Sequence, residues 1–185
     1  MERIHITETP RDAMQGWNRI IPTWQKSNYI SLLLKAGFDT VDVGSFVSPK
    51  AVPQMEDTEH LFSGIDFSET TSRIMVVVGN SRGGMKAMQY HRISIISFPY
   101  STSPTFLQRN INSNPQKALN DLLELKKQGM EYGKTIRVYL SMAFGNPYKD
   151  AWSEDQILGE VDRLQKLGFY DIVLSDITGE VNNPD

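Results

Sequence analysis

The sequence predicts an α/β fold, a (β/α)8-type barrel of which about six of the eight β/α units are present. A short β-rich run, a turn and a helical segment recur in this order roughly every 30 residues, as in consecutive βαβ units. Several of the β-rich runs are near-continuous in Val, Ile and Leu, which is typical of parallel strands covered on both faces. Polar residues follow the strands at equivalent positions, and in a barrel that end carries the active site.

The first half of the chain supplies four of the expected strands. The first strand, RIHIT (3–7), leads into a turn at 10–12. Apolar residues at helical spacing then predict a helix over 22–38, with a proline near its start and a glycine at its stop. The further strands of this half, with two short helices between them, are expected at 40–46, 73–79 and 92–98, and the helices at 58–62 and 84–89.

The second half continues the alternation. A long polar loop is expected after residue 98, followed by a helix over 115–133. The fifth strand is TIRVYLSMAF (135–144), a helix follows over 153–167, and DIVLSDI (171–177) is the sixth strand. Right-handed crossovers between parallel strands would bring the loops that follow them to one end of the sheet.

Two architectures compete for this pattern, a doubly wound open sheet and a barrel. No G-x-G-x-x-G follows the first strand, which weakens the dinucleotide-binding version of the open sheet. The polar residues at the strand ends favour the barrel, and they are Arg11, Asp12, Asp42, Ser45, Asn80, Tyr100, Ser101, Asn146 and Asp176. We therefore expect a single barrel domain over residues 1–185.

The pattern contains six strands, whereas a closed barrel needs eight. An open six-stranded curved sheet would leave two edges with unpaired backbone groups. We therefore expect either a fragment or a truncated gene product, or a second copy or second chain that supplies the missing strands.

Composition excludes several classes of protein. The net charge is −3 and the pI is about 5.6, so no basic field favours nucleic acid. The longest apolar runs are far shorter than the roughly 20 residues of a membrane span, and MERIHITETP lacks a hydrophobic signal segment. The chain has no cysteine, which removes disulfides and thiolate metal sites and fits a cytoplasmic protein. We expect no nucleic acid and no membrane partner.

Five segments carry a resemblance to a known family. GSFVSPKAVPQMED (44–57) resembles the segment after the second strand of 3-hydroxy-3-methylglutaryl-CoA (HMG-CoA) lyases, where S-F-V-S-P-K and V-P-Q-M recur. PRDAMQ (10–15) is similar to the family's P-R-D-G-L-Q, and RNIN (109–112) to its K-N-I-N. FGNPY (144–148) is similar to its G-C-P-Y, and LSDITG (174–179) to its L-G-D-T-I-G. The chain thus resembles the N-terminal part of this family, within the wider DRE-TIM metallolyase group.

The resemblance implies a metal-dependent carbon–carbon lyase that uses Mg²⁺ or Mn²⁺. Such an enzyme splits HMG-CoA into acetyl-CoA and acetoacetate, a reaction of leucine degradation. The acyl-CoA thioester would be the substrate, and the family likeness suggests a homodimer. Cleavage of this kind needs a base for the tertiary hydroxyl and stabilisation of the thioester enolate.

The first group of implied site residues follows the first strand. Asp12 matches the family's metal-binding carboxylate, and an oxygen ligand suits Mg²⁺ or Mn²⁺. Arg11 matches the arginine that stabilises negative charge on the substrate, a task for which a guanidinium fork is suited. Gln15 is expected to position substrate by hydrogen bonds. In the structural alternative, Asp12 and Gln15 cap the turn and Arg11 is a partner of Asp12 alone.

The second group lies on later strands. Asp42 stands where the family has a Glu, with a shorter reach, and is either catalytic or a buried structural carboxylate. Ser45 and Asn80 are expected to bind substrate. Asp176 matches the family's catalytic Asp on the sixth strand, although Ser175 replaces the preceding Gly, and the alternative is a helix cap.

His5, His60 and His91 are isolated, and we expect none of them to be a ligand. The family's His-x-His ligands and its mobile cysteine loop would fall beyond Asp185. The chain as given is therefore expected to bind metal weakly and to turn over little. Two alternatives stay open: a related metal-dependent aldolase or acyl-CoA condensing enzyme, and a non-catalytic acyl-CoA-binding or assembly fragment.

Overall fold

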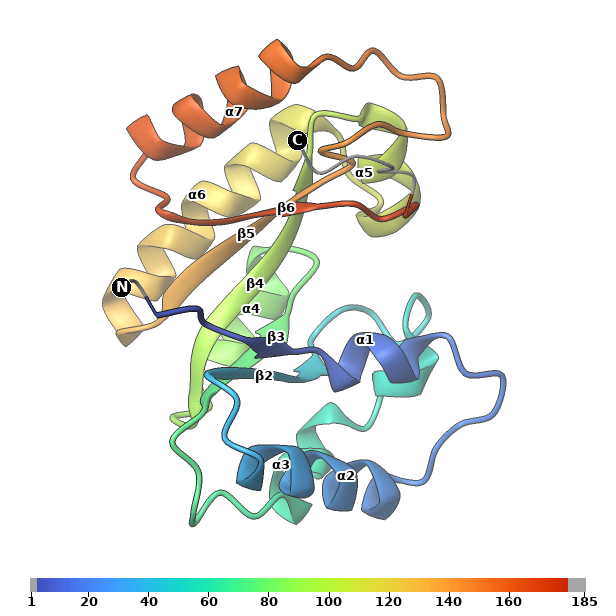
Figure 1. Cartoon of the computed structure of the whole chain (residues 1–185), viewed down its shortest axis with the longest axis vertical. Coiled ribbons are helices and arrows are strands. Elements are labelled where there is room, and N and C mark those ends of the chain that lie inside the picture. Colours follow the sequence, from blue (N-terminus) through green and yellow to red (C-terminus); the bar gives the residue numbers. More distant parts are fainter. Residues whose placement is uncertain (1–2, 180–185) are drawn as a thin grey trace.

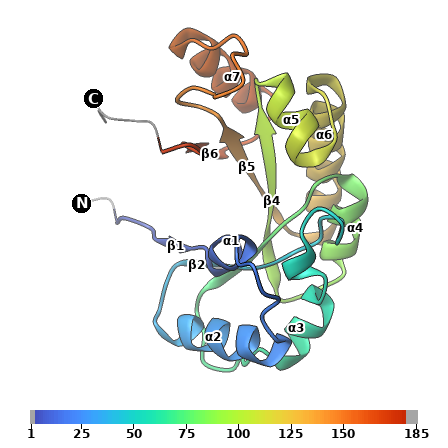
Figure 2. The same cartoon turned by 90° about the vertical axis from the view of Figure 1, so that its right-hand side faces the viewer.

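A curled sheet of six parallel strands forms the centre of the molecule in the computed structural model, which describes residues 3–179. The strand order is β1-β2-β3-β4-β5-β6, so each strand pairs with its neighbours in sequence. The helices lie along the outer side of the sheet, and β1 and β6 form its two edges (Figures 1 and 2). The predicted barrel with six of its eight β/α units is confirmed in its incomplete form.

The strands agree with the predicted positions and differ at their ends. They are β1 (Thr7–Glu8), β2 (Thr40–Ser45), β3 (Arg73–Val77), β4 (Ile93–Ser101), β5 (Thr135–Ser141) and β6 (Asp171–Ser175). The first strand is much shorter than the predicted 3–7. The residues before Thr7 do not continue the strand, because the Ile6 N–H donates to the Asp39 carboxylate at 2.9 Å instead of to a neighbouring strand.

The helices α2 (Thr23–Lys35), α3 (Thr58–Gly64), α4 (Ser81–Met88), α6 (Pro115–Tyr132) and α7 (Glu154–Lys166) also lie where the sequence predicts them. A 3₁₀ turn, η1 (Pro53–Met55), precedes α3. Several of these helices begin at a side-chain cap. Asn114 accepts a hydrogen bond from the Lys117 N–H at 2.9 Å, and Ser153 accepts one from the Gln156 N–H at 3.2 Å. Such caps satisfy backbone groups that a helix start leaves free.

Two helices occupy segments that the sequence predicted to be irregular. The turn at 10–12 is the start of α1 (Pro10–Gln15), with proline at its first position. The polar loop after β4 contains α5 (Pro104–Ile111), whose start is capped by the Ser103 hydroxyl accepting from the Phe106 N–H at 3.1 Å. Both are short, so their apolar periodicity spans too few turns to be distinct.

The two faces of the sheet have different chemistry. The face toward the helices is apolar, and the buried core there includes Val41, Val43, Ile74, Val76, Val78, Ile96, Phe98, Val138 and Leu140. The inner face carries polar side chains at alternate positions, most regularly on β5, where Thr135, Arg137, Tyr139 and Ser141 lie in register with Ile95, Ser97, Pro99 and Ser101 of β4. An interior lined by side chains from every strand is the arrangement of a small barrel.

A hydrogen bond crosses the interior of the curled sheet from β5 to β1. The Arg137 Nη1 of β5 donates to the Thr7 hydroxyl of β1 at 3.0 Å, over 130 residues of sequence. In a barrel of eight strands the first and fifth strands stand opposite each other, four places apart. The side chains of β1 and β5 therefore meet across the interior, as those of opposite strands do in an eight-stranded barrel.

Candidate active site

The carboxyl ends of β1 and β2 bring four of the predicted site residues together around one guanidinium. Arg11 Nε and Nη2 donate to Asp42 Oδ2 at 3.0 and 2.6 Å. Arg11 Nη1 donates to Asp12 Oδ1 at 2.7 Å and to Gln15 Oε1 at 3.0 Å. Asp12 and Gln15 come from the same short helix, α1, while Asp42 belongs to β2. The cluster therefore joins the two strands at the end where a barrel carries its chemistry.

The local fold explains why Arg11 turns inward. Proline at the first position of α1 starts the helix directly after β1, so the next side chain lies over the end of β2. The Arg11 side chain is 11% exposed and the Asp42 side chain is 0% exposed, whereas Asp12 is 67% exposed. Asp12 therefore faces the solvent side of the guanidinium, and Asp42 lies beneath it.

Burial sets the electrostatics of this pair. Burial raises the pKa of Asp42, and the nearby Arg11 charge offsets this only in part. Burial alone would lower the pKa of Arg11, but the charge of Asp42 and its hydrogen bonds raise it instead. The Gly44 backbone N–H also acts on this carboxylate and opposes the effect of burial, but Asp42 Oδ1 accepts no side-chain hydrogen bond within the described residues. A buried acceptor of this kind has room for a donor from a ligand.

Tyr139 and Arg137 lie in the same interior, although the sequence analysis did not select them. Burial raises the pKa of Tyr139, and the Asp42 charge adds to this effect. Arg137 Nε donates to Asp171 Oδ1 at 2.8 Å. Their signal in the sequence was the alternation of polar and apolar residues in TIRVYLS, which predicts one polar face on this strand.

The remaining predicted residues have local partners. Ser45 is buried, and its hydroxyl accepts from the Val47 N–H at 3.2 Å. Asn80 caps α4, with its side-chain oxygen accepting from the Gly83 N–H at 2.9 Å. Asp176 follows β6, and its carboxylate accepts from the Gly179 N–H at 2.9 Å. Their substrate-binding and catalytic roles stay predictions.

The divalent cation implied by the resemblance would need several oxygen or nitrogen ligands that converge on one point. In residues 3–179, no group of three or more Asp, Glu or His side chains converges on a point that could hold a metal ion. Asp12 offers one exposed carboxylate, which already accepts a hydrogen bond from Arg11. The donors in this part of the chain therefore do not make a metal site by themselves, although Asp12 is placed to contribute one ligand.

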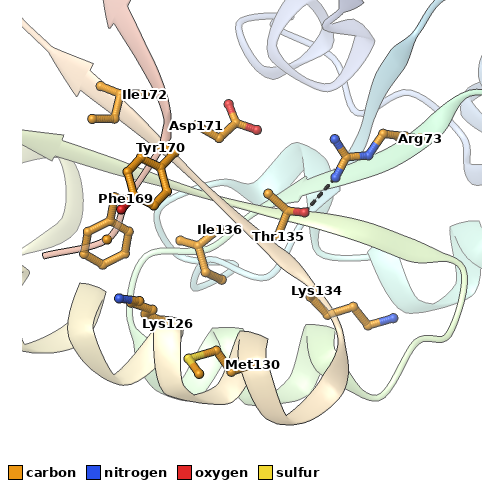
Figure 3. A pocket seen from close by; sticks show the side chains of 11 residues that line it. Arg73, Lys126, Met130, Lys134, Thr135, Ile136, Phe169, Tyr170, Asp171 and Ile172 are labelled. Carbon is orange, nitrogen blue, oxygen red and sulfur yellow. Dashed lines mark hydrogen bonds between the residues drawn. The ribbon is translucent and has the colours of Figure 1, made fainter. Parts of the chain in front are cut away.

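A cavity of about 550 Å³ lies at the opposite end of the strands, beside the first residues of β5 and β6 (Figure 3). Arg73 donates to the Thr135 hydroxyl there at 2.7 Å. Lys134 Nζ donates to the Ile93 carbonyl at 2.6 Å, and Lys126 Nζ to the Leu167 carbonyl at 2.6 Å. Arg73 and Lys134 bond to the first residues of β5 and β4, and Lys126 bonds to the end of α7. The cavity therefore lies at the amino ends of the strands, away from the Arg11 cluster.

A second ion pair, between Lys26 of α2 and Asp57, connects the loop after β2 to α2. Lys26 of α2 donates to the Gln54 carbonyl at 2.5 Å and to Asp57 Oδ1 at 2.6 Å. The Gln54 side chain in turn accepts from the Ile21 N–H at 2.8 Å and donates to the Arg19 carbonyl at 3.0 Å. The V-P-Q-M segment therefore holds the chain that connects α1 to α2, and so supports the helix that carries Arg11.

Comparisons with known proteins agree with this architecture. Residues 3–185 match the sequence model of a family described as HMGL-like. The mitochondrial hydroxymethylglutaryl-CoA lyase of Bos taurus is 31% identical over 179 residues, which cover 96% of this chain and 54% of that protein. The chain therefore spans about half the length of this curated relative.

Solved structures give the same result. The HMG-CoA lyase of Bacillus subtilis superposes with a TM-score of 0.89 at 28% identity, over 97% of this chain and 60% of the other. An HMG-CoA lyase from Acinetobacter baumannii, solved in complex with coenzyme A and 3-methylmalate, gives a TM-score of 0.88 at 28% identity. That match covers 96% of this chain and 58% of the other.

Proposed function

The chain belongs to the HMGL-like family, and we propose that it carries the Arg–Asp half of the active site of a metal-dependent carbon–carbon lyase acting on HMG-CoA. The observation that carries the proposal is the cluster of Arg11, Asp12, Gln15 and Asp42 at the carboxyl ends of β1 and β2. The acyl-CoA substrate is supported by the Acinetobacter baumannii relative, which was solved with coenzyme A.

The reaction releases acetoacetate and acetyl-CoA without adding or removing any other group. A base takes the proton of the tertiary hydroxyl, the carbonyl of acetoacetate forms, and the carbon–carbon bond breaks. Its electrons pass to the thioester, which becomes an enolate and is then protonated. The raised pKa of Asp42 makes this carboxylate a stronger base than an exposed one, which suits it to accept the hydroxyl proton.

Arg11 is suited to stabilise the developing negative charge. A guanidinium has five N–H donors, and four of them are engaged, two with Asp42, one with Asp12 and one with Gln15. The second N–H of Nη2 is therefore left to donate to a substrate oxygen. The charge-assisted bonds to Asp42 hold the fork in one orientation before substrate arrives, so little reorganisation is needed during the reaction.

A cation would supply further charge stabilisation to the forming carbonyl when it is bound. We propose that Asp12 provides one of its ligands and that the others come from outside the described residues. The catalytic role of Asp176, and the substrate-binding roles of Gln15, Ser45 and Asn80, complete the proposal.

We further propose that the active form is a closed barrel. β1 and β6 are the edges of the sheet, and apolar side chains beside both edges are exposed, with Ile4 at 84%, Ile6 at 55% and Leu174 at 44%. Since side chains of β1 and β5 already meet across the interior, two further parallel strands would cover these residues and pair with both edges. Relatives of greater length offer such strands, and a second copy of this chain is the other source.

The test is acetoacetate release from HMG-CoA with Mg²⁺. The chain alone is expected to release little, and a chain fused to the two following β/α units of the Bacillus subtilis lyase is expected to turn over. In the fused protein Arg11→Met should lower kcat by a factor of about 10²–10³, the usual loss for one oxyanion donor. Arg163→Met, at a surface arginine of α7, is the matched control and should leave kcat unchanged.

The outcomes separate the alternatives. Full activity of the fused protein after Arg11→Met would contradict the proposed site. Binding of HMG-CoA without release of acetoacetate in both forms would favour an acyl-CoA-binding module. Condensation of acetyl-CoA with an oxo-acid in the fused protein would favour a condensing enzyme.

The compartment also stays a proposal. We propose a cytoplasmic protein, although the bovine relative is mitochondrial. Within residues 3–179, each helix is too short or too polar to cross a membrane. A homodimer is proposed for the closed form, and sedimentation of the chain and of the fused protein would test it.

A further inference from the structure

The cavity at the amino ends of β5 and β6 has a charged side and an apolar side (Figure 3). Its volume of about 550 Å³ lies within the roughly 300–1,000 Å³ of small-molecule pockets. Arg73 and Lys134 stand on one side of it, and Phe169 and Tyr170 stand on the other, with Ile136 between them. A space divided in this way suits a ligand that has one charged end and one apolar end.

The charged side holds more positive than negative charge. Arg73 and Lys134 donate only to neutral oxygens in the part of the chain that the structure describes. The Asp171 carboxylate also lines the cavity, but its Oδ1 accepts from Arg137 Nε at 2.8 Å. Burial lowers the pKa of Lys134, because it removes water from the ammonium group. An anion on this side would therefore stabilise two cations that have no carboxylate partner among the described residues.

Donors for such an anion are available on the charged side. Arg73 is exposed, and its bond to the Thr135 hydroxyl uses Nη2, so Nε and Nη1 make no hydrogen bond within residues 3–179. The Thr135 hydroxyl accepts this bond at 2.7 Å and keeps its own proton to donate. Lys134 uses its three N–H groups on backbone carbonyls, so it contributes charge without a donor.

The apolar side offers area that a ligand would cover. Met130 and Tyr170 are 77% and 83% exposed, whereas Phe169 belongs to the buried core. Lys126 is a cation on this side, and its Nζ is held by the Leu167 carbonyl at 2.6 Å and lies 5.6 Å from the centre of the Phe169 ring. A hydrocarbon or aromatic group would remove part of Met130 and Tyr170 from water, which is favourable, and a bare inorganic anion would not.

We propose that this cavity binds a small organic carboxylate that carries an apolar group. The carboxylate accepts hydrogen bonds from Arg73 and the Thr135 hydroxyl, beside the charge of Lys134, and the apolar group lies against Met130 and Tyr170. A guanidinium fork matches the geometry of a carboxylate. The inference is independent of the proposed lyase activity, because the cavity lies at the opposite end of the strands from the Arg11 cluster.

The experiment uses three probes that separate the two ends of the ligand. 4-Phenylbutyrate has both the charge and the apolar group, 4-phenyl-1-butanol lacks the charge, and butyrate lacks the ring. Their dissociation constants are measured from the amide NMR shifts of residues 134–136 and 168–172. 4-Phenylbutyrate should bind about five-fold or more tightly than either of the other probes, as expected when a charge-assisted hydrogen bond and apolar burial add.

Variants assign the two ends to residues. Arg73→Gln should weaken binding of 4-phenylbutyrate by about five-fold or more and leave 4-phenyl-1-butanol within about two-fold. Arg92→Gln is the matched control, since this exposed arginine precedes β4 and lies over the Phe67 ring outside the cavity. It should leave the affinity for 4-phenylbutyrate within about two-fold. Tyr170→Ser should weaken both aromatic probes by a similar factor.

Four results would overturn the inference. The first is the absence of saturable shifts at these amides with 4-phenylbutyrate up to about 10 mM, which leaves only very weak binding. The second is equal affinity for the acid and the alcohol, and the third is an equal loss in Arg73→Gln and Arg92→Gln. The fourth is loss of binding in the fused protein, where the added β/α units would then occupy the cavity. Acetoacetate release enters none of these readouts, so the proposed function stands or fails separately.

Discussion

Lys26→Met tests whether the buried ion pair beneath the site supports the fold as strongly as its geometry indicates. The Lys26 side chain is 0% exposed and the Asp57 side chain is 19% exposed, with 2.6 Å between Nζ and Oδ1. Methionine keeps the volume but leaves Asp57 without its cation and the Gln54 carbonyl without its donor. Removing one partner of a buried pair costs about 3–5 kcal/mol.

The expected loss for Lys26→Met is smaller than this general cost because of the surroundings of Asp57. Asp57 is partly open to water and keeps the hydrogen bond from the Thr23 hydroxyl at 2.5 Å. We therefore expect a loss of about 2–4 kcal/mol in the free energy of unfolding, or roughly 5–15 °C in melting temperature for a chain of this size. The assay is urea unfolding followed by circular dichroism at pH 7.

Lys35→Met is the matched control, since it removes a lysine from the same helix. Its partner Asp66 lies at 3.7 Å and both side chains are 50% exposed, so the expected loss is below about 1 kcal/mol. A double-mutant cycle with Asp57→Asn should give a coupling energy above about 1 kcal/mol. Equal losses for the two lysine variants, or a coupling energy near zero, would refute the reasoning.

Two further predictions concern glycines and one concerns pH. A Cβ at Gly83 would meet the Phe46 carbonyl oxygen at 2.5 Å, so Gly83→Ala should destabilise the chain by about 1–3 kcal/mol in thermal melts. Gly159 in α7 has nothing within 4 Å, so Gly159→Ala should stabilise by up to about 1 kcal/mol, and a loss there would contradict the packing. Burial raises the pKa of Asp42 above 3.8 despite Arg11, so its contribution to stability is full below that pH and is lost as the pH rises through the folded-state pKa. Asp42→Asn should abolish the decrease in unfolding free energy that accompanies the rise in pH. An unchanged pH dependence in this variant would show that the Asp42 carboxylate is not its cause.

Much of the fold followed from the sequence because its signals are local. Continuous runs such as IMVVV are strands wherever they are buried on both faces, and the order of the six strands follows from short right-handed crossovers. The two missed helices, α1 and α5, begin at a proline after a strand, where a turn and a helix start have the same composition.

The candidate site was predictable in part. The segment 10–15 indicated Arg11, Asp12 and Gln15 together, because residues of one turn must lie close. The pairing of Arg11 with Asp42 depends on the contact between α1 and β2, a tertiary property that no spacing reveals. Tyr139 was missed because an inward-facing residue of a barrel strand becomes a site residue only through the strands opposite it.

The shortness of β1 has a consequence for when the site is formed. β1 has two residues in register with β2, and it carries the helix with Arg11 and Asp12. Short edge strands are usually the first part of a sheet to open in native-state hydrogen exchange. We therefore expect the amides of residues 7–15 to exchange fastest among the ordered elements, and a bound thioester to slow their exchange. Binding of the thioester would then stabilise β1 and α1.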